Sequence, residues 1–563
     1  ELEVFVPESS RITKHQILVK TEDVKVDVVD PGVEKLFLRL PTPSMEDNIG
    51  DLERLKRGLA EKGFGEVVVP LEVLRLLPQI LRKKDWCVTA TIMKDGSKAV
   101  ITSLEPGDTS SKLFGVAIDI GTTTVVVNLV DLVRGRVVGT ESDYNKQVVY
   151  GEDVLSRITH VEEKGQDGLE ELNRLIVETI NNLIKKLVEN HLKDSSLVNS
   201  IVFGVASGNT TMTQLFLGID PHYIRYEPYV PAAGLPPMVK ASELGLATNP
   251  GGYIYLSPGR AAYVGGDITS DILASGIHKM EELSLLIDVG TNGEVVLGNN
   301  DWLVACSCSA GPAFEGGEVE HGMRAMLGAI DKIEIDESYE AKYHTIGDAR
   351  PRGICGSGLI DLMAEMLVHG IIDRKGKIQK VDTNRIRVRN GVPEYVVAWA
   401  TEASDEPEKM AGEKAGEKDI VITETDIANI IRTKAALYAS ANTLLKSLGL
   451  KFGDVDRIVL AGGFGNYIDV EKAVLIGMLP DVGFDRFRFI GNGSLLGATI
   501  ALISEKKRRE LEEIYKKITY VDLSKNNIFF NEFSSSLFLP HTNMEMFPTA
   551  KKMLEKRGNS LEV

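Results

Sequence analysis

Two short stretches decide the fold of this chain: FGVAIDIGTTT at residues 114–124 and SLLIDVGTNGE at residues 284–294. Each is an apolar run that ends in an aspartate and is followed by a glycine–threonine turn and a second apolar run. Short apolar runs bounded by turn residues predict buried strands. The two aspartates, Asp119 and Asp288, are 169 positions apart, since 288 − 119 = 169. Two copies of strand, D-x-G-T-[TN], strand predict a duplicated α/β domain with a cleft between its halves.

The two turns have the composition of a phosphate-binding site. Glycine allows backbone amides to approach a nucleoside triphosphate closely, because it has no Cβ and tolerates positive φ. Asp119 and Asp288, each at a strand end, are expected to hold Mg²⁺ through its waters, since magnesium prefers oxygen ligands. One D-x-G-T is equally well explained by a simple β-turn, but two in matched settings favour the phosphate site. The turn residues predicted to bind nucleotide are Gly121, Thr122, Thr123, Thr124, Gly290, Thr291, Asn292 and Gly293.

Two further glycine-led segments are predicted to form helices. Gly265-Gly266-Asp267 opens an apolar helical run at 268–277, and Gly493-Ser494 opens another at 495–503. Both runs contain small residues, which would let two helices cross closely at a hinge. A buried strand at 458–461 leads into glycines suited to backbone contact with an adenosine, with Gly462, Gly463 and Phe464 as the predicted contacts. Taken alone, this last pattern is more often an ordinary strand and turn.

The order of these five motifs resembles that of the acetate and sugar kinase, heat-shock chaperone and actin superfamily over residues 114–540. The resemblance implies a duplicated actin-like (ribonuclease H-like) fold that binds ATP with Mg²⁺. It implies that Asp119 and Asp288 are catalytic through the metal, and that Asp267 orients the attacking water or acceptor hydroxyl. The alternative for Asp267 is a helix N-cap, a position that aspartate favours.

The rest of the chain suggests three regions. Residues 1–29 predict an extended linker, and residues 30–109 a small α/β middle domain with helices at 45–61 and 71–81. Residues 110–563 form the actin-like ATPase domain, with subdomains at about 110–280 and 281–540 and a C-terminal tail. The charged, repetitive segment 402–419 is expected to be a solvated loop or disordered insertion.

Charge and cysteine content exclude several classes of protein. Lys and Arg number 64 against 81 Asp and Glu, so the net charge is −17, which disfavours binding to nucleic acid or to anionic membranes. No segment reaches the ~20 continuous apolar residues that a membrane span requires. Four cysteines in 563 residues argue against a disulfide framework, and no signal peptide is evident, so a cytoplasmic location is expected.

Strings outside the ATP core carry a narrower resemblance. They are Asn145-x-Gln147, Tyr150 to Ile158, Gly208-Asn209-x-x-Met212, Ala310 to Gly316, Gly322 to Ala325 and Gly353 to Asp361. Together they resemble the reductive activators of corrinoid proteins, over nearly the whole chain. The resemblance implies ATP-dependent, one-electron reduction of a partner's Co(II) corrinoid to Co(I) in a methyl-transfer pathway. In such activators the electron passes through an N-terminal [2Fe–2S] domain or, in some relatives, C-terminal clusters.

The sequence departs from that family in its cysteines. Four cluster-spaced cysteines are missing, and Cys306-x-Cys308 with Cys355 would supply three thiolates at most, so buried structural cysteines are the favoured interpretation. Because residues 1–29 resemble the linker that follows the ferredoxin domain, we expect the [2Fe–2S] cluster in an N-terminal domain absent from this sequence. The alternative explanation is that this protein is a relative of the activators that carries out no reduction. His541 matches a family string without an assigned role.

The sequence therefore predicts a corrinoid activator whose partners are a corrinoid protein and an external or N-terminal electron donor, and a homodimer is one oligomeric state that the resemblance allows. ATP is expected to close the two halves and so reshape a surface docked on the partner. The resulting shift in the cobalt reduction potential is limited by the difference between the affinities of the nucleotide-bound protein for the two states of the complex. The alternatives are a sugar or carboxylate kinase of the same fold, which would need a polar pocket beside Asp267, and a nucleotide-dependent chaperone, which would need a peptide-binding module.

Overall fold

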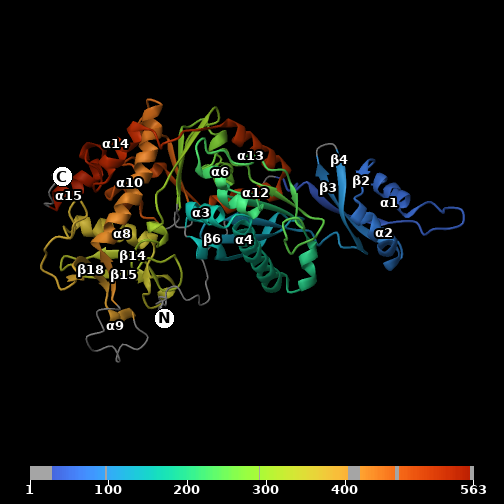
Figure 1. The fold of residues 1–563 in the computed structure, drawn as a ribbon, viewed down its shortest axis with the longest axis horizontal. Helices are drawn as coiled ribbons and strands as arrows, with labels where there is room; N and C mark the ends of the chain where they lie inside the picture. The colour runs from blue at the N-terminus through green and yellow to red at the C-terminus, as the bar shows by residue number, and fades with distance from the viewer. Residues whose placement is uncertain are drawn as a thin grey trace. The chain divides into compact units, whose positions relative to one another are not determined.

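The computed structural model describes residues 28–95, 98–151, 153–290, 292–403, 419–462 and 468–557. The chain divides into two compact units (Figure 1). Among the described residues, unit 1 comprises residues 275–492 and 518–557, and unit 2 comprises residues 28–274 and 493–517. Residues 493–517 therefore belong to the same unit as the earlier part of the chain. The predicted linker, apart from Val28 and Val29, and nearly all of the charged segment 402–419 lie outside the described residues.

The first part of unit 2 is a small α/β layer with its own core, drawn in blue in Figure 1. Its sheet has the strand order β1-β3-β4-β2, and α1 and α2 bury apolar side chains such as Leu55 and Leu77 against it. The elements are β1 (Val33–Arg39), α1 (Asp51–Ala60), β2 (Val67–Val68), α2 (Leu71–Lys83), β3 (Cys87–Asp95) and β4 (Lys98–Pro106). Helix α1 begins later than the predicted residue 45, because Ser44 Oγ accepts from the amides of Glu46 and Asp47 and holds a turn there.

The larger sheet of unit 2 has the order β7-β6-β5-β8-β10-β9. Its strands are β5 (Phe114–Ile120), β6 (Thr124–Asp131), β7 (Arg136–Tyr144), β8 (Ile201–Gly208), β9 (Val239–Lys240) and β10 (Tyr253–Leu256). Its helices are α3 (Val154–Lys164), α4 (Gln166–Leu187), α5 (Thr210–Phe216), α6 (His222–Arg225), α7 (Gly266–Ser275), α12 (Gly493–Ile503) and α13 (Glu505–Lys517). Helix α4 packs on β6 and β7, and α12 packs on β5 and β8. Leu172, Ile176, Ile180 and Leu187 of α4 recur on one face and are fully buried, as an amphipathic helix requires.

Helices α7 and α12 cross at a glycine, as their small residues predicted. A Cβ on Gly497 would clash with the carbonyl oxygen of Ser270. Thr499 in α12 also accepts a hydrogen bond of 3.0 Å from Asn128 Nδ2 in β6, and both side chains are buried. The crossing therefore depends on the absence of a side chain at residue 497, and it fixes both helices against the sheet.

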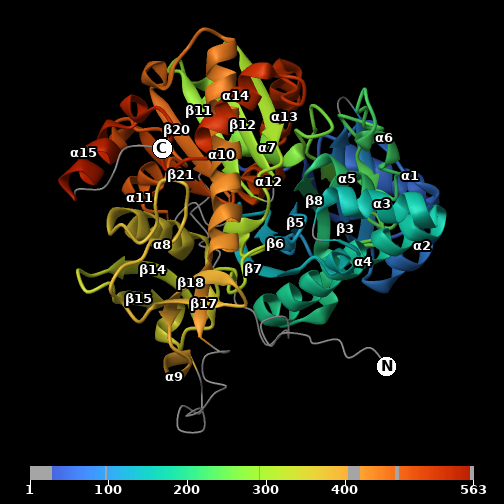
Figure 2. The same cartoon turned by 60° about the vertical axis from the view of Figure 1, so that its left-hand side comes forward.

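Unit 1 is built on a second sheet, of order β21-β20-β11-β12-β13-β22. Its strands are β11 (Ser284–Val289), β12 (Gly293–Gly298), β13 (Leu303–Cys308), β20 (Arg457–Ala461), β21 (Phe487–Gly491) and β22 (Ile518–Tyr520). Figure 2 shows β20, β11 and β12 side by side, and α10 (Glu424–Ser447) packs on this sheet. A capping box between Thr423 and Asp426 starts α10.

The rest of unit 1 carries two smaller sheets, β15-β14-β16 and β17-β18-β19. Their strands are β14 (Ala329–Ile335), β15 (Ala341–Thr345), β16 (Gly353–Ile354), β17 (Ile386–Arg389), β18 (Val392–Ala398) and β19 (Ile420–Thr423). The helices are α8 (Gly356–Val368), α9 (Ala400–Ala403), α11 (Val470–Leu475), α14 (Asn527–Ser536) and α15 (Pro548–Lys556). Helix α8 packs on β14, and α14 packs on α10. In the described ranges no helix is long and apolar enough to cross a membrane.

The two large sheets share one plan, which confirms the predicted duplication. In unit 2, β5 pairs antiparallel with β6 and parallel with β8. In unit 1, β11 pairs antiparallel with β12 and parallel with β20. Each aspartate of the repeat lies near the carboxyl end of the central strand of its trio. The fold is therefore the duplicated actin-like α/β architecture preceded by a small α/β layer.

The helix crossing makes a stability prediction. Replacing Gly497 with alanine should lower the free energy of unfolding by about 1–3 kcal/mol, the usual range for overpacking a core, because the methyl group meets Ser270 backbone. Gly65→Ala is the matched control, since a Cβ at that glycine has no neighbour within 4 Å. Urea unfolding of both variants measures the difference. An unchanged midpoint for Gly497→Ala would contradict the close crossing.

Candidate nucleotide site

The hairpin of unit 2 places Asp119 beside the end of a parallel strand. Asp119 lies opposite Ser207 in the pairing of β5 with β8, and its side chain is half-buried. Its Oδ1 accepts a hydrogen bond of 2.8 Å from Ser494 Oγ, at the start of α12. Asp119 is therefore oriented by a helix that is separated from it by 375 positions in the sequence.

A chain of serine hydroxyls continues from that bond. Ser494 Oγ lies 3.1 Å from Ser207 Oγ, which in turn lies 3.0 Å from Ser270 Oγ in α7. Ser270 donates to Ser257 Oγ at 3.0 Å, and Ser207 donates to the carbonyl of Gly266 at 2.9 Å. All four serines are buried. This series of hydroxyls links the predicted first phosphate hairpin to both glycine-led helices. Of the four serines, only Ser494 was named in a sequence motif.

Asp267 lies in the first turn of α7, as its second residue. Its Oδ1 accepts a hydrogen bond of 2.8 Å from the amide of Ile268, and the side chain is half-buried. A carboxylate at a helix N-terminus is stabilised by the helix dipole. The structure thus holds this carboxylate at a helix start, within the same unit as the Asp119 hairpin.

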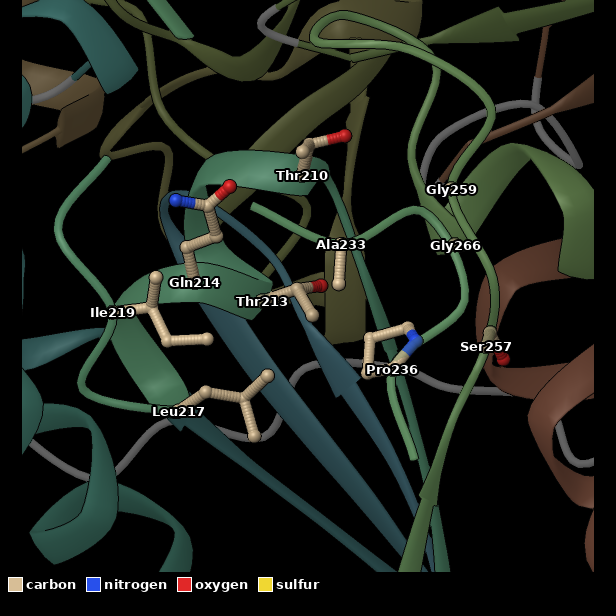
Figure 3. A pocket seen from close by; sticks show the side chains of 10 residues that line it. All are labelled: Thr210, Thr213, Gln214, Leu217, Ile219, Ala233, Pro236, Ser257, Gly259 and Gly266. Atoms are coloured by element: carbon tan, nitrogen blue, oxygen red, sulfur yellow. The ribbon is translucent and has the colours of Figure 1, made fainter. Parts of the chain in front are cut away.

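A small cavity lies beside Gly266 (Figure 3). It measures about 10 Å³, which is room for about one water molecule. It is lined by Thr210, Thr213, Gln214, Leu217, Ile219, Ala233, Pro236, Ser257, Gly259 and Gly266. Its lining is mostly apolar, and its volume is far below the several hundred Å³ typical of a small-molecule pocket.

The hairpin of unit 1 repeats the arrangement with a glycine in the partner strand. Asp288 lies opposite Ala461 in the pairing of β11 with β20, and Gly462 follows at once. Gly462 has φ +109°, and a Cβ there would lie 3.2 Å from Asp288 Oδ1 and would clash with the carbonyl of Val289. Only glycine fits this close approach without strain. The structure thus brings the first residue of the predicted adenosine segment against the predicted second phosphate hairpin.

The turn of this hairpin is closed by its own backbone. The amide of Gly290 donates to the carbonyl of Asn292 at 3.1 Å. Gly293 begins β12, where Cys308 donates to its carbonyl at 3.4 Å. Of the other predicted contacts, Thr291, Gly463 and Phe464 lie outside the described residues.

A carboxylate that no sequence pattern predicted as a site residue lies near this turn. Glu315 Oε1 would be 3.5 Å from a Cβ on Gly290. Glu315 belongs to the glycine-rich segment 310–324, which carries part of the family resemblance without an assigned role. Its proximity to the turn gives that segment a place at the predicted nucleotide site of unit 1.

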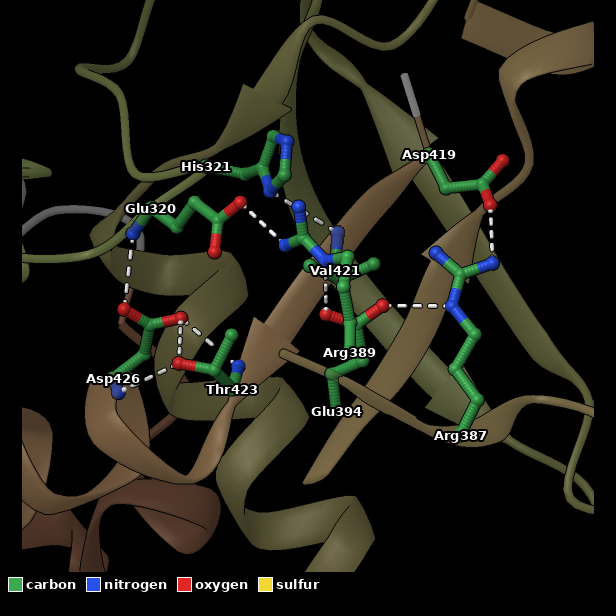
Figure 4. A network of polar contacts seen from close by, with 9 residues as sticks. All are labelled: Glu320, His321, Arg387, Arg389, Glu394, Asp419, Val421, Thr423 and Asp426. Carbon is green, nitrogen blue, oxygen red and sulfur yellow. Dashed lines mark hydrogen bonds and ion pairs between the residues drawn. The ribbon is translucent and has the colours of Figure 1, made fainter. Parts of the chain in front are cut away.

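A charge network supports the glycine-rich segment (Figure 4). Buried Glu394 accepts from Arg387 Nε at 2.7 Å and from Arg389 Nε at 2.8 Å. Arg389 also pairs with Glu320, whose amide donates to Asp426 Oδ1 at 3.0 Å. Burial lowers the pKa of neighbouring His321, whose Nδ1 accepts from the amide of Val421. The network ties the segment to β17, β18, β19 and the start of α10.

The residues of both hairpins fit Mg-ATP. Carboxylates, hydroxyls and glycine-rich backbone are the groups that bind hydrated magnesium and phosphates. Asp119 in unit 2 and Asp288 in unit 1 are the predicted residues that would bind hydrated magnesium. In the described part of the chain, no group of three or more His, Cys, Asp or Glu side chains is arranged to hold a metal directly.

The cysteines do not fit an iron–sulfur cluster. A cluster requires several thiolates at one place, and among the described residues no group of three or more His, Cys, Asp or Glu side chains could hold a metal. Burial raises the pKa of Cys308 to about 12 and also raises the pKa of Cys306 and Cys355. Cys355 donates to the carbonyl of Ile330 at 3.3 Å. All four cysteines are free, and these three behave as buried structural thiols.

His541 is part of the core of unit 1. Its ring packs against Tyr438 and Phe547, and its Nδ1 accepts from the amide of Asn543 at 3.0 Å. Burial lowers the pKa of His541 to about 4, so it is neutral at neutral pH. Buried Lys434 donates to the carbonyls of Phe538 and Pro540, which fastens the preceding segment to α10. These contacts give the His541 segment a structural role.

Comparison with known protein families covers nearly the entire chain. Residues 282–551 match the C-terminal domain of RACo, the ASKHA domain. Residues 114–280 match the RACo middle region, and residues 23–111 match the RACo linker region. The three matches are collinear with the repeat and with the small α/β layer.

Individual relatives agree with the family matches. A solved structure of a reductive activator for corrinoid, iron–sulfur protein is 46% identical, with a TM-score of 0.85, and the match covers 97% of this chain and 86% of that one. The corrinoid activation enzyme RamQ of Eubacterium limosum is 32% identical over 81% of this chain and 77% of its own length. The [Co(II) methylated amine-specific corrinoid protein] reductase of Methanosarcina barkeri is 24% identical over 72% and 73%. The chain belongs to the RACo family of reductive activators of corrinoid proteins.

Proposed function

We propose that this protein reactivates a corrinoid protein by coupling ATP binding and hydrolysis to the one-electron reduction of Co(II) to Co(I) in a methyl-transfer pathway. The observation that carries the proposal is a pair of matched aspartate–glycine hairpins in a chain that is similar over 97% of its length to a solved reductive activator. The names of the relatives support a corrinoid protein as the partner.

The chain's own residues would divide the work between phosphates, metal and adenosine. The hairpin amides and hydroxyls would bind the β- and γ-phosphates. Asp119 and Asp288 would bind hydrated Mg²⁺, and Gly462, Gly463 and Phe464 would contact the adenosine. Bound Mg²⁺ supplies neutralisation of the phosphate charge. Asp267 orients the water that attacks the γ-phosphate and accepts its proton. Hydrolysis yields ADP and phosphate, and the protein state that it selects favours the reducible form of the docked partner.

The electron must come from a separate donor. One electron converts Co(II) to Co(I), and in the described part of the chain the four cysteines belong to no group of three or more ligands that could hold a metal. We propose an external donor or a [2Fe–2S] domain joined N-terminally, acting in the cytoplasm, where free thiols persist. A kinase is less well supported, because the relatives that match most of the chain are named as corrinoid activators or reductases.

The paired aspartates give the first test. Asp119→Ala and Asp288→Ala should each weaken Mg-ATP binding by about tenfold or more, because each removes a charged ligand of hydrated magnesium. Hydrolysis should fall with binding. Asp301→Ala is the control, since Asp301 is exposed in the turn between β12 and β13. Calorimetric titration with Mg-ATP measures the affinity, and wild-type values in both single variants would remove the site from these hairpins.

Asp267 gives the second test. Asp267→Asn should leave the Kd for Mg-ATP unchanged and lower kcat for hydrolysis by about 10²-fold or more, the usual contribution of a general base. The amide keeps an oxygen that can accept from Ile268, so the helix start is preserved. Steady-state hydrolysis with separately measured binding resolves the two quantities. Weaker binding with unchanged turnover per bound nucleotide would make Asp267 a cap or ligand.

The partner gives the third test. Hydrolysis by the 563-residue protein should accelerate with a Co(II) corrinoid protein and stay at its basal rate with a panel of sugars and carboxylates. With a mild reductant alone, little Co(I) should form, and addition of a purified [2Fe–2S] ferredoxin-type donor should produce it, as followed by the corrinoid absorption spectrum. Acceleration by a sugar with phosphate transfer to it would favour the kinase. Efficient Co(I) formation without the donor would contradict the proposed source of the electron.

A further inference from the structure

The first phosphate hairpin is held from one side by two residues of the segment that precedes and includes α3. The carbonyl of Gly121 accepts from Asn145 Nδ2 at 3.0 Å, and the carbonyl of Thr122 accepts from the guanidinium of Arg157. The carbonyl of Thr123 accepts from the backbone amide of Asn145 at 2.9 Å. Three consecutive carbonyls of the turn are thus engaged by Asn145 and Arg157.

This arrangement determines where the amides of the turn point. In a planar trans peptide, the C=O and the following N–H point in opposite directions. Because the carbonyls of Gly121 and Thr122 point toward Asn145 and Arg157, the amides of Thr122 and Thr123 point away from them. Successive amides on one side of a turn form an anion-binding concavity.

Arg157 is the unusual member of this support. Its side chain is fully buried, and its other acceptors are neutral: Gln147 Oε1 at 2.9 Å, the carbonyl of Gly151 at 3.2 Å and Met212 Sδ at 2.9 Å. Burial lowers the pKa of Arg157 to about 10, partly opposed by the charge of Asp153, so the group is cationic at neutral pH. A buried cation among neutral acceptors is costly, and a bound anion nearby offsets part of that cost.

Gln147 and Asn209 complete the support. Gln147 Nε2 donates to the carbonyl of Leu172 in α4 at 2.8 Å, which leaves its Oε1 directed to Arg157. Asn209, the N-cap of α5, donates from Nδ2 to Thr122 Oγ1 at 3.0 Å. The turn is therefore braced against α3, α4 and α5 of the same unit.

We propose that Arg157 is a positioning residue for the phosphates of ATP. It holds the Thr122–Thr123 peptide with its amide toward the nucleotide, and its buried charge strengthens the attraction of the hairpin for the β- and γ-phosphates. The inference rests on the proposed function, since it concerns the same nucleotide. It assigns a role to the segment 145–158, whose residues the proposed mechanism does not otherwise use.

The test compares Arg157→Gln and Arg157→Lys with matched variants of Arg508. Arg508 is buried in the same unit, and burial likewise lowers its pKa to about 10. It donates to the carbonyls of Ala501 and Pro31, and neither lies in the hairpin. Arg508→Gln therefore removes an equally buried guanidinium without touching the turn.

The readouts are the Kd values of Mg-ATP, Mg-ADP and adenosine, and the hydrogen exchange of the peptide 114–126 without nucleotide. Arg157→Gln should raise the Kd for Mg-ATP by about tenfold or more, the size of a charged hydrogen bond, and leave the Kd for adenosine unchanged. Arg157→Lys, which keeps the charge without the fork of donors, should give an intermediate Kd. Exchange in the hairpin should quicken in Arg157→Gln and stay at the wild-type rate in Arg508→Gln.

The outcomes separate this inference from the proposed function. An unchanged Kd for Mg-ATP in Arg157→Gln, or an equal rise in Arg508→Gln, would overturn the inference while leaving the function intact. Should wild-type protein bind no Mg-ATP, the proposed function fails, and the exchange comparison alone reports whether Arg157 holds the hairpin. If Arg157→Gln does not fold, Arg157→Lys decides, since wild-type affinity in that variant overturns the role of the guanidinium fork.

Discussion

The parallel pairing of an aspartate-ended strand with its neighbour is the constraint on which each unit depends. Parallel strands bring their carboxyl ends to the same edge of a sheet, so Asp119 meets Ser207 and Asp288 meets the Ala461–Gly462 step. The residues at the end of each neighbouring strand must then be small or polar enough to lie against a carboxylate. The hydroxyl chain in unit 2 and the strand-ending glycine in unit 1 are two solutions to that requirement, and both leave the turn itself to glycine, threonine and asparagine.

The two units support their hairpins with different chemistry. Unit 2 uses neutral hydroxyls, amides and a single buried guanidinium, and such groups are stable in a core only when their hydrogen bonds are made. Unit 1 uses an ion network around buried Glu394, in which Arg387 and Arg389 both pair with Glu394 and also pair with Asp419 and Glu320, respectively. A buried ion network is favourable only when each charge is paired, so its value lies in fixing the glycine-rich segment near Gly290 as much as in stability.

These supports relate to function through pre-organisation. A phosphate site binds tightly when its donors already point at the ligand, because little ordering remains to be done on binding. In unit 2 the proposed phosphate donors are backbone amides, whose direction is set by their peptide planes and not by a side-chain rotamer. Asn145 and Arg157 fix those planes by donating hydrogen bonds to the carbonyl oxygens of Gly121 and Thr122. The same segment exposes Val149 and Leu155 to solvent, so its inner and outer faces have distinct environments.

The sequence by itself determined the duplication, the strands of both hairpins, the two glycine-led helices and the family resemblance, because these depend on local patterns: apolar runs, turn residues and motif order. Asp119, Asp288 and Gly462 were predictable for that reason. Only the tertiary structure revealed Ser494 bonded to Asp119, Arg157 bonded to Thr122, and Glu315 near Gly290. Those contacts join residues 375, 35 and 25 positions apart, the last since 315 − 290 = 25. No periodicity encodes such distances, since the packing of helices on the sheets sets them.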